Sequence, residues 1–483
     1  MKHWIRKTCF LFLFAGIVYA EDVPVFRRQV IQVPMSSLDW VWPYWKDINE
    51  DGLVDLLALV QRDEKAFIYL QNSTGFPSAP TQSIDLPEGT AWLTLYDVNE
   101  HPGNEMLIST IRGLVYYRQN NGIFEMKPEK LIDAGQVFVS SHSPIIIEPN
   151  RLPEKLKNTI PVVFSDHTVI YRCDENYRLS PVEEIEYEFK STMEKFNWNS
   201  WSIGAKSSDQ IRIKTTAQGK SEDSELRKPE EENEYIKSML EKTKEKELQA
   251  CFVVREDIDG DGNEDVALVN IVQDVDVKTN VIIFLRQKDG QLPEKPNQVL
   301  RCRGIPVKGD YPRPSYFSPF VDINKDGYLE IVMIELKALL LSASSILEAV
   351  VSKGLDWVLS IRQFKEGKGY SNRADFKMDI TTILPISEQF VDFIKFDGDF
   401  NADGRPDFIV RRAPTQCSIY LSSPTGNFYD REPKLQLEVP AEGRTFVEDL
   451  NSDGISDIYL IDYEKGRIAV FLSESSQKKG PSQ

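Results

Sequence analysis

Cysteine and histidine are scarce in this sequence of 483 residues, which contains five cysteines and four histidines. No two cysteines have the C-x-x-C spacing, so neither a zinc site nor a redox motif is predicted. Basic residues are also fewer than acidic ones: the sequence has 57 Lys and Arg and 75 Asp and Glu, which gives a formal net charge of −18. Nucleic acids and anionic membranes are bound by clustered Lys and Arg, so the charge argues against both partners.

The first twenty residues have the pattern of an export signal. Lys2, Arg6 and Lys7 precede a short apolar segment, and Ala20 ends a small-residue cleavage site. About ten apolar residues cannot span a bilayer of roughly 30 Å, and no later stretch reaches the ~18 of a membrane helix. We therefore expect a cleaved signal peptide at residues 1–20, no transmembrane segment, and a secreted, periplasmic or cell-surface protein. Cleavage removes three basic residues and no acidic one, which lowers the formal charge to −21.

Four cysteines follow the signal peptide: Cys173, Cys251, Cys302 and Cys417. An exported chain can form disulfides, but the sequence does not choose among the three complete pairings. All three therefore stay open.

The composition is that of a folded chain rich in strands. Hydrophobic residues make up 41% of the sequence, which excludes global disorder. Aromatic residues at 11%, with 27 Pro and 26 Gly, favour many short strands and turns. The length allows two or three compact domains, or one domain built from repeats.

A nine-residue motif recurs along the chain. Five copies follow the pattern D-x-(N/D)-x-D-G-x-x-(D/E), at residues 47–55, 257–265, 322–330, 399–407 and 449–457. A sixth copy, at 97–105, keeps the outer positions but has His101 in place of the acid at position 5. Five full copies at one spacing exclude chance, so the motif defines a repeat.

The spacing of oxygens in this motif is that of a site for a hard cation. Side chains at positions 1, 3, 5 and 9 and the carbonyl of position 7 supply oxygens, and Gly at position 6 permits a tight reversal. Ca²⁺ accepts six to eight oxygens at about 2.3–2.6 Å, whereas Mg²⁺ requires a stricter octahedron. Metal-free Asx-type turns are the alternative, because Asp, Asn and Gly are common in turns. We expect about five Ca²⁺ sites, with the ligands Asp47, Asn49, Asp51, Asp55, Asp257, Asp259, Asp261, Asp265, Asp322, Asn324, Asp326, Glu330, Asp399, Asn401, Asp403, Asp407, Asp449, Asn451, Asp453 and Asp457.

The sequence around the loops excludes an EF-hand. An EF-hand needs a bidentate acid at position 12 and a helix on each side. Position 12 instead holds an apolar residue in all five copies, and the flanks are β-rich runs such as 56–60. These position-12 residues are Ala58, Leu268, Met333, Val410 and Leu460. The repeating unit is therefore strand, acidic loop, strand, turn, strand, turn, strand.

A repeating four-stranded unit predicts an all-β fold, a β-propeller with four antiparallel strands per blade. We expect one propeller domain at 21–475 and a disordered tail at 476–483. Residues 25–33 can supply the strand that is missing after 467–472 and so close the ring, which hides the sheet edges. Six or eight blades stay possible, but seven are favoured by the second hairpins near Phe67, Leu114, Thr168, Val281, Trp357, Ser418 and Ile468. The hairpin near Thr168 follows no acidic loop.

The loops resemble the calcium-binding loops of FG-GAP and VCBS repeats, as in the β-propeller head of integrin α subunits and many exported bacterial proteins. The resemblance covers nearly all of the chain after the signal peptide. It implies that the side chains at positions 1, 3, 5 and 9 of each full copy are Ca²⁺ ligands. The sequence departs from the pattern at His101, and the Phe-Gly and Gly-Ala-Pro signatures are mostly absent.

Two insertions interrupt the repeat. The first, about 183–250, includes Lys220 to Glu247, where 17 of 28 residues are charged. It reads as a mobile surface segment or an arm that docks a partner. The second, about 335–354, places seven apolar residues, from Leu336 to Val351, on one helical stripe that Gly354 ends. This helix packs on its own domain or meets a partner or membrane surface.

Little in the sequence points to catalysis. Only His101, His142 and His167 follow the signal peptide, and no nucleophile-elbow, zinc-protease or P-loop motif is present. We therefore expect a protein- or glycan-binding module for adhesion, as the resemblance implies, rather than an enzyme. A propeller-based glycosidase or polysaccharide lyase is the alternative, since its acid and base meet only in space. Four tryptophans are candidates for stacking on sugars or for packing between blades: Trp92, Trp198, Trp201 and Trp357. Neither the ligand nor the oligomeric state follows from the sequence.

Overall fold

The structure of the chain is a computed structural model. It describes residues 25–36, 40–60, 62–96, 104–110, 112–132, 145–146, 160–163, 167–173, 178–186, 214–215, 249–273, 277–287, 290–309, 317–337, 354–383, 393–423 and 428–474. The predicted signal peptide and the predicted disordered tail lie outside these residues.

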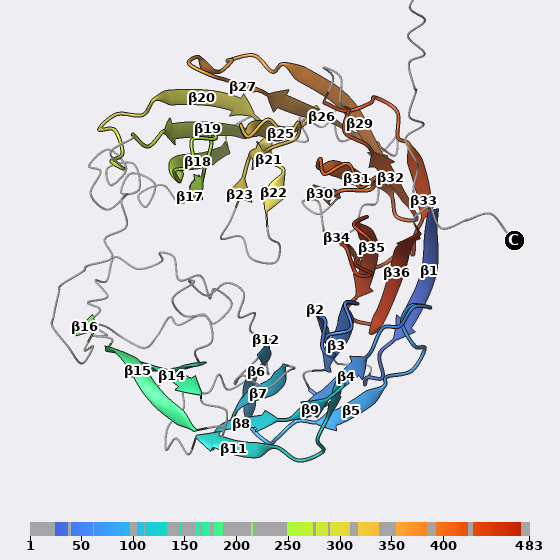
Figure 1. Ribbon diagram of the computed structural model, residues 1–483. Helices are drawn as coiled ribbons and strands as arrows, with labels where there is room; N and C mark the ends of the chain where they lie inside the picture. Colours follow the sequence, from blue (N-terminus) through green and yellow to red (C-terminus); the bar gives the residue numbers. More distant parts are fainter. Residues whose placement is uncertain are drawn as a thin grey trace, which may run out of the picture.

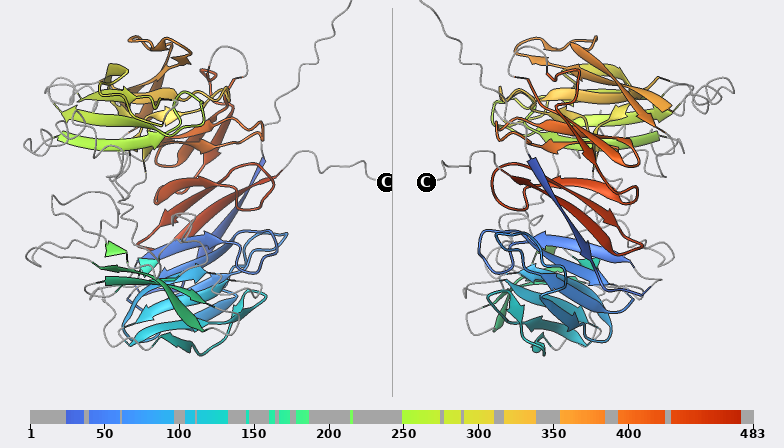
Figure 2. Two further views of the ribbon diagram at one scale, coloured as in Figure 1. Left: turned by 60° about the vertical axis from the view of Figure 1, so that its left-hand side comes forward. Right: turned by 90° about the vertical axis from the view of Figure 1, so that its right-hand side faces the viewer.

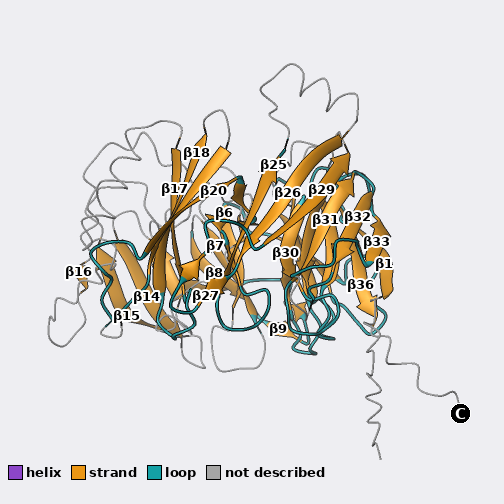
Figure 3. Ribbon diagram, turned by 90° about the horizontal axis from the view of Figure 1, so that it is seen from above, coloured by secondary structure: helices purple, strands orange, loops and turns teal. Residues whose placement is uncertain are grey.

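The described residues are strands and loops with no helix among them, and Figure 3 shows the two in different colours. The predicted all-β class is confirmed. In this part of the chain, nothing forms a helix of the length and apolarity that crossing a bilayer requires.

Seven sheets of four or five strands account for most of the described residues, and we number them 1 to 7 along the chain. Sheet 1 contains β2 (Val41–Lys46), β3 (Asp55–Val60), β4 (Lys65–Tyr69) and β5 (Gln82–Asp85). Sheet 2 contains β6 (Thr90–Tyr96), β7 (Glu105–Thr110), β8 (Gly113–Tyr117), β11 (Glu129–Ile132) and β12 (Ile145–Ile146). Sheet 3 contains β13 (Ile160–Val163), β14 (His167–Cys173), β15 (Leu179–Glu186) and β16 (Lys214–Thr215). Sheet 4 contains β17 (Gln249–Glu256), β18 (Asp265–Gln273), β19 (Val277–Phe284) and β20 (Gln298–Arg303).

The remaining three sheets follow the same plan. Sheet 5 contains β21 (Ile305–Pro306), β24 (Phe320–Val321), β25 (Glu330–Leu336), β26 (Gly354–Arg362) and β29 (Phe376–Ile383). Sheet 6 contains β30 (Ile394–Gly398), β31 (Asp407–Ala413), β32 (Gln416–Tyr420) and β33 (Leu435–Glu438). Sheet 7 contains β34 (Arg444–Glu448), β35 (Asp457–Asp462), β36 (Arg467–Glu474) and β1 (Val25–Gln32). Three two-stranded ribbons complete the described strands: β9 (Gln119–Asn120) with β10 (Ile123–Phe124), β22 (Lys308–Gly309) with β23 (Phe317–Ser318), and β27 (Phe364–Lys365) with β28 (Gly369–Tyr370).

The sheets stand one after another around an arc in chain order (Figure 1). In sheets 1, 4, 6 and 7, the first strand (β2, β17, β30 or β34) lies toward the middle of the arc. The fourth strand (β5, β20, β33 or β1) lies toward the outside. Each of the seven predicted second hairpins falls on a different sheet, on β4, β8, β14, β19, β26, β32 and β36.

Burial explains why successive strands of one sheet differ in sequence. The second strands are continuous apolar runs, and all six residues of β3 and of β35 are buried, because both of their faces are covered. The outer strand β29 alternates buried and exposed residues, as expected for a strand with one face in solvent. The hydrophobic clusters lie between neighbouring sheets: one joins sheets 7 and 1 through Leu450, Tyr459 and Leu56, and another joins sheets 5 and 6.

The N-terminal strand completes the last sheet, as predicted. β1 pairs antiparallel with β36 in unbroken register, from Val25 opposite Glu474 to Gln32 opposite Arg467. Figure 2 shows this blue strand lying against the red C-terminal strands. Ile31 and Val33 are buried in the cluster between sheets 7 and 1. The two ends of the described chain are therefore fixed to one another.

The strands that border the two predicted insertions are among the described residues. β15 continues to Glu186 and β17 begins at Gln249, and within the first insertion Lys214–Thr215 pairs with β15 as β16. The remainder of that insertion and residues 338–353 lie outside the described residues. Leu336, which was expected on the helical stripe, is the last residue of β25, and Gly354, which was expected to end the helix, is the first residue of β26. The second insertion connects β25 to β26, which are neighbours in sheet 5.

Replacing Ile31 by Ala tests the pairing of β1. This side chain is 1% exposed, so Ile31→Ala removes buried contacts and should lower the free energy of unfolding by about 2–5 kcal/mol. Val30 on the same strand is 46% exposed, and Val30→Ala should cost at most ~1 kcal/mol. Urea unfolding measures both. Equal, small losses in the two variants would show that β1 does not pack against β36.

Candidate metal-binding loops

All five full copies of the acidic motif lie within the described residues. Each copy joins two neighbouring antiparallel strands of its sheet: β2 to β3, β17 to β18, β24 to β25, β30 to β31 and β34 to β35. Of the sixth copy only Asn104 and Glu105 are described, so His101 and the predicted departure there lie outside the described residues.

The backbone of the five loops turns at two positions. The glycines at position 6 have φ between +78° and +88°, a region that side chains other than glycine enter at a cost. A Cβ atom added to any of them would meet nothing within 4 Å, so the demand for glycine comes from the backbone alone. Position 4 is left-handed as well, although only one copy has glycine there. The position-4 residues are Glu50, Gly260, Lys325, Ala402 and Ser452.

Each loop closes on its own acidic side chains. In the copy at 399–407, the Asp399 carboxylate accepts hydrogen bonds from the backbone N–H of Asp403 at 3.1 Å and of Gly404 at 2.7 Å. The carboxylate of Asp403 accepts one from the N–H of Arg405 at 2.9 Å. The copies at 47, 257 and 449 repeat all three hydrogen bonds, and the copy at 322 repeats the second and third. The carboxylates at positions 1 and 5 are thus held in one geometry.

The acid at position 9 is buried and joins two parts of its sheet. Asp457 is fully buried; its Oδ2 accepts the N–H of Leu450 at 2.7 Å, and its Oδ1 accepts that of Ser473 on the third strand at 2.6 Å. Asp55, Asp265 and Asp407 do the same with the matching residues of their sheets, at 2.7–2.9 Å. In the copy with the longer side chain, Glu330 accepts the N–H of Ile323 and the side-chain amide of Asn324.

Burial makes these position-9 carboxylates costly to ionise. It raises their pKa, the hydrogen bonds from backbone N–H groups lower it, and the acids of the same loop raise it further. The resulting pKa is about 6 for Asp55 and Asp265, about 7 for Asp407 and Asp457, and about 8 for Glu330. A divalent cation beside such a group favours its charged form.

Two loops contain carboxylate oxygens that need a partner. Oδ1 of Asp259 and Oδ1 of Asp322 are shielded from solvent, and no hydrogen-bond donor among the described residues reaches them. In the copy at 257–265, one oxygen from each of Asp257, Asp259 and Asp265 lies within 4.8 Å of the others. Oxygens around one Ca²⁺ at 2.3–2.6 Å lie at most about 5 Å apart, so this spacing fits a shared cation.

Loops of neighbouring sheets are hydrogen-bonded to one another. The N–H of Val54 donates to Leu450 O at 3.0 Å, and that of Leu329 donates to Ile258 O at 3.1 Å. The N–H of Ser456 donates to Asp399 O at 2.8 Å. The loops therefore gather at one end of the sheets and connect sheet 1 to 7, sheet 5 to 4 and sheet 7 to 6.

The structure places other residues that the sequence singled out. The five position-12 residues are buried in strands, which confirms that the loops are not EF-hands. Trp357 is 6% exposed, packs on Phe393 and donates its indole N–H to Thr382 Oγ1 at 2.9 Å, so it packs inside the protein and is not a surface for sugars. Trp198, Trp201 and His142 lie outside the described residues, and of Trp92 only the backbone is described.

Two of the four cysteines are described with their side chains. Cys302 and Cys417 are free, buried thiols, and burial raises the pKa of Cys417 to about 12. No disulfide joins these two residues.

Comparison with protein families supports the repeat. Residues 399–460 match the family model of the FG-GAP-like repeat. The chain therefore contains an FG-GAP-like repeat at these residues. The matched FG-GAP repeat runs from position 1 of one acidic loop into the strand after the next, so it spans sheets 6 and 7. A search of curated proteins finds no match to the chain.

The two left-handed positions of the FG-GAP repeat respond to substitution in opposite directions. At Gly404, with φ +78°, Gly404→Ala should lower the free energy of unfolding by about 1–2 kcal/mol, because alanine resists this backbone region. At Ala402, with φ +57°, Ala402→Gly relieves the same strain and should leave stability unchanged or raise it by up to ~1 kcal/mol. Chemical unfolding of both variants checks this, and the account of the loop backbone is wrong if Ala402→Gly is the more destabilising.

Proposed function

We propose that the chain is an exported, calcium-binding β-propeller of seven blades that serves as a protein- or glycan-binding module. The match to the FG-GAP-like repeat supports a propeller-type module. Modules of this type often act in adhesion or binding, which supports the proposed function. The seven sheets around one arc and the pairing of β1 with β36 support seven blades and a ring closed by strands from both ends of the chain.

One observation carries the calcium assignment: five loops hold the same set of oxygens in the same backbone geometry. The acid at position 9 of each loop is buried. The acids at positions 1 and 5 accept hydrogen bonds from backbone N–H groups of the same loop. In two loops an oxygen lacks any other partner among the described residues. Gathering several carboxylates around one buried acid is unfavourable without a cation, and Ca²⁺ would supply the positive charge that the loops lack.

Calcium would stabilise the ring rather than take part in a reaction. Four of the five loops are tied through position 9 to the end of the third strand of their own sheet. Three backbone hydrogen bonds tie loops of neighbouring sheets to one another. A cation bound in each loop would hold the loop in the geometry that these hydrogen bonds require. The opposite end of the sheets, which carries the turns between second and third strands, is then free to meet a partner.

Chelation tests this assignment. At a hundredfold excess over its Kd, each bound Ca²⁺ stabilises the folded state by about 2.7 kcal/mol. Removal of Ca²⁺ from five sites should therefore lower Tm by something on the order of 10 °C. Scanning fluorimetry of the purified protein in Ca²⁺, in Mg²⁺ and in EDTA measures the shift, with Mg²⁺ expected to restore less than Ca²⁺. An unchanged Tm in excess EDTA contradicts the assignment.

A further inference from the structure

An exposed aromatic cluster lies at the end of sheets 1 and 7 that is opposite the acidic loops. Trp40 and Trp42 are 49% and 36% exposed, the two exposed tryptophans among the side chains that the structure describes. They stand at the start of β2, whereas the loop follows its end at Lys46. Both rings lie against the same tyrosine of the neighbouring sheet, so the two side chains point to one side.

A tyrosine from the neighbouring sheet joins the two tryptophans. The ring of Tyr463, in the turn between β35 and β36, lies 6.2 Å from that of Trp40 and 6.3 Å from that of Trp42. Arg444 at the start of β34 places its guanidinium 5.9 Å from the centre of the same ring. The N–H of Val41 donates to Tyr463 O at 3.3 Å, which fixes the two sheets to each other here. We call Trp40, Trp42, Tyr463 and Arg444 the aromatic surface.

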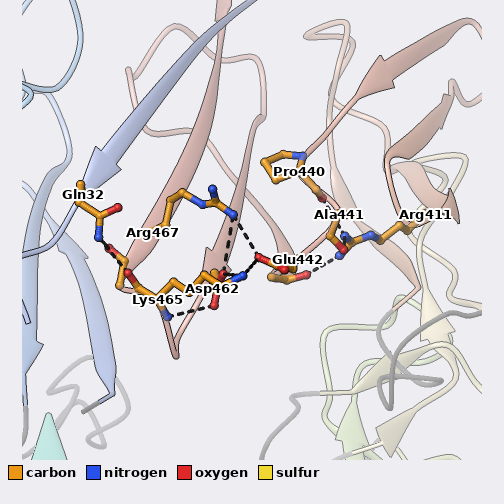
Figure 4. A network of polar contacts seen from close by, with 10 residues as sticks. Gln32, Arg411, Pro440, Ala441, Glu442, Asp462, Lys465 and Arg467 are labelled. Atoms are coloured by element: carbon orange, nitrogen blue, oxygen red, sulfur yellow. Dashed lines mark hydrogen bonds and ion pairs between the residues drawn. The ribbon is translucent and has the colours of Figure 1, made fainter. Parts of the chain in front are cut away.

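The backbone beside the aromatic surface is held rigidly. Arg411 donates hydrogen bonds to the carbonyls of Pro440 at 2.9 Å and Ala441 at 2.8 Å, and also to that of Gly443 (Figure 4). These carbonyls belong to the connection that leads into Arg444. A Cβ atom at Gly443 would lie 2.9 Å from the backbone of Ile461, so the connection is also packed closely on β35. A surface that is rigid before binding loses little entropy when a ligand arrives.

A cluster of charged side chains belongs to the same hairpin as Tyr463 and to the connection before β34. Glu442, Lys465 and Arg467 form ion pairs around Asp462, the residue before Tyr463 (Figure 4). Asp462 is 9% exposed, and its Oδ2 has no hydrogen-bond donor among the described residues; the nitrogens of Lys465 and Arg467 stay 3.8 Å away. Within the aromatic surface itself, hydrogen-bond donors are supplied by the guanidinium of Arg444, 5.9 Å from the centre of the Tyr463 ring.

The size of the aromatic surface favours a sugar over a folded protein. A stable protein interface buries about 800 Å² on each partner. An aromatic side chain buries roughly 150–250 Å² when fully covered, and the two tryptophans are already half covered or more. The apolar area is thus several times too small for such an interface. It matches one or two pyranose rings, whose C–H faces pack on aromatic rings while their hydroxyls bond to charged side chains.

We propose that the aromatic surface binds a pyranose unit of a polysaccharide, with Trp40 and Trp42 stacking on the ring and the guanidinium of Arg444 donating hydrogen bonds to its hydroxyls. The proposal specifies the ligand class of the binding module proposed above. It does not depend on the calcium assignment, because the acidic loops lie at the other end of the strands.

The test is a glycan array screened with the purified full chain, followed by titration of the retained polysaccharides with tryptophan fluorescence as the readout. We expect saturable binding that changes the tryptophan emission. The double variant Trp40→Ala/Trp42→Ala should weaken binding at least tenfold, as loss of aromatic anchors commonly does. Met126→Ala is the matched control. Met126 is 69% exposed and lies between β10 and β11, so this variant should bind like the unmodified chain.

The outcomes separate this proposal from the calcium assignment. If the double variant keeps its melting shift in Ca²⁺ but loses polysaccharide binding, the aromatic surface is the binding site. Undiminished binding by the double variant overturns the proposal, as does an array on which the unmodified chain retains no glycan. Retention of a protein that depends on Trp40 and Trp42 also overturns it, in favour of a protein partner. None of these results alters the effect of EDTA on Tm.

Discussion

The structure depends on one repeated interaction: a buried carboxylate that ties the acidic loop to the strands behind it. In four of the five loops the position-9 aspartate accepts an N–H from position 2. It accepts another from a residue at or just beyond the end of the third strand, 15 to 21 residues further along. Such a group is expensive to bury unless its oxygens are satisfied. The requirement for this acid is therefore set by the fold as well as by any metal.

The same loops also organise the contacts between sheets. Hydrogen bonds such as those of Val54 with Leu450 and of Ser456 with Asp399 join loops of neighbouring sheets at one end of the arc. Apolar clusters fill the space between the sheets, and β1 joins the last sheet to the start of the chain. The opposite end of sheets 1 and 7 carries the aromatic surface of Trp40, Trp42, Tyr463 and Arg444, where the hydrogen bond from Val41 to Tyr463 joins the two sheets a second time.

Local features of the fold follow from the sequence, and those made by distant residues do not. The glycine at position 6, the strands that flank the loops and the pairing of β1 with β36 were all predicted from spacing and alternation. The left-handed residue at position 4 was not, because Glu50, Lys325, Ala402 and Ser452 share no side-chain property. The aromatic surface was missed for a different reason. Trp40 and Trp42 read as part of an apolar strand, and only the packing of sheet 7 on sheet 1 brings Tyr463 to them.

Counting the calcium ions bound to the intact chain tests the account most directly. Native mass spectrometry at micromolar Ca²⁺ should show five ions per chain, one for each full copy of the motif. Asp453→Ala, which removes the position-5 acid from one loop, should lower the count to four. A chain that binds no calcium, or one whose count is the same in this variant, would contradict the claim that the acidic loops are the metal sites.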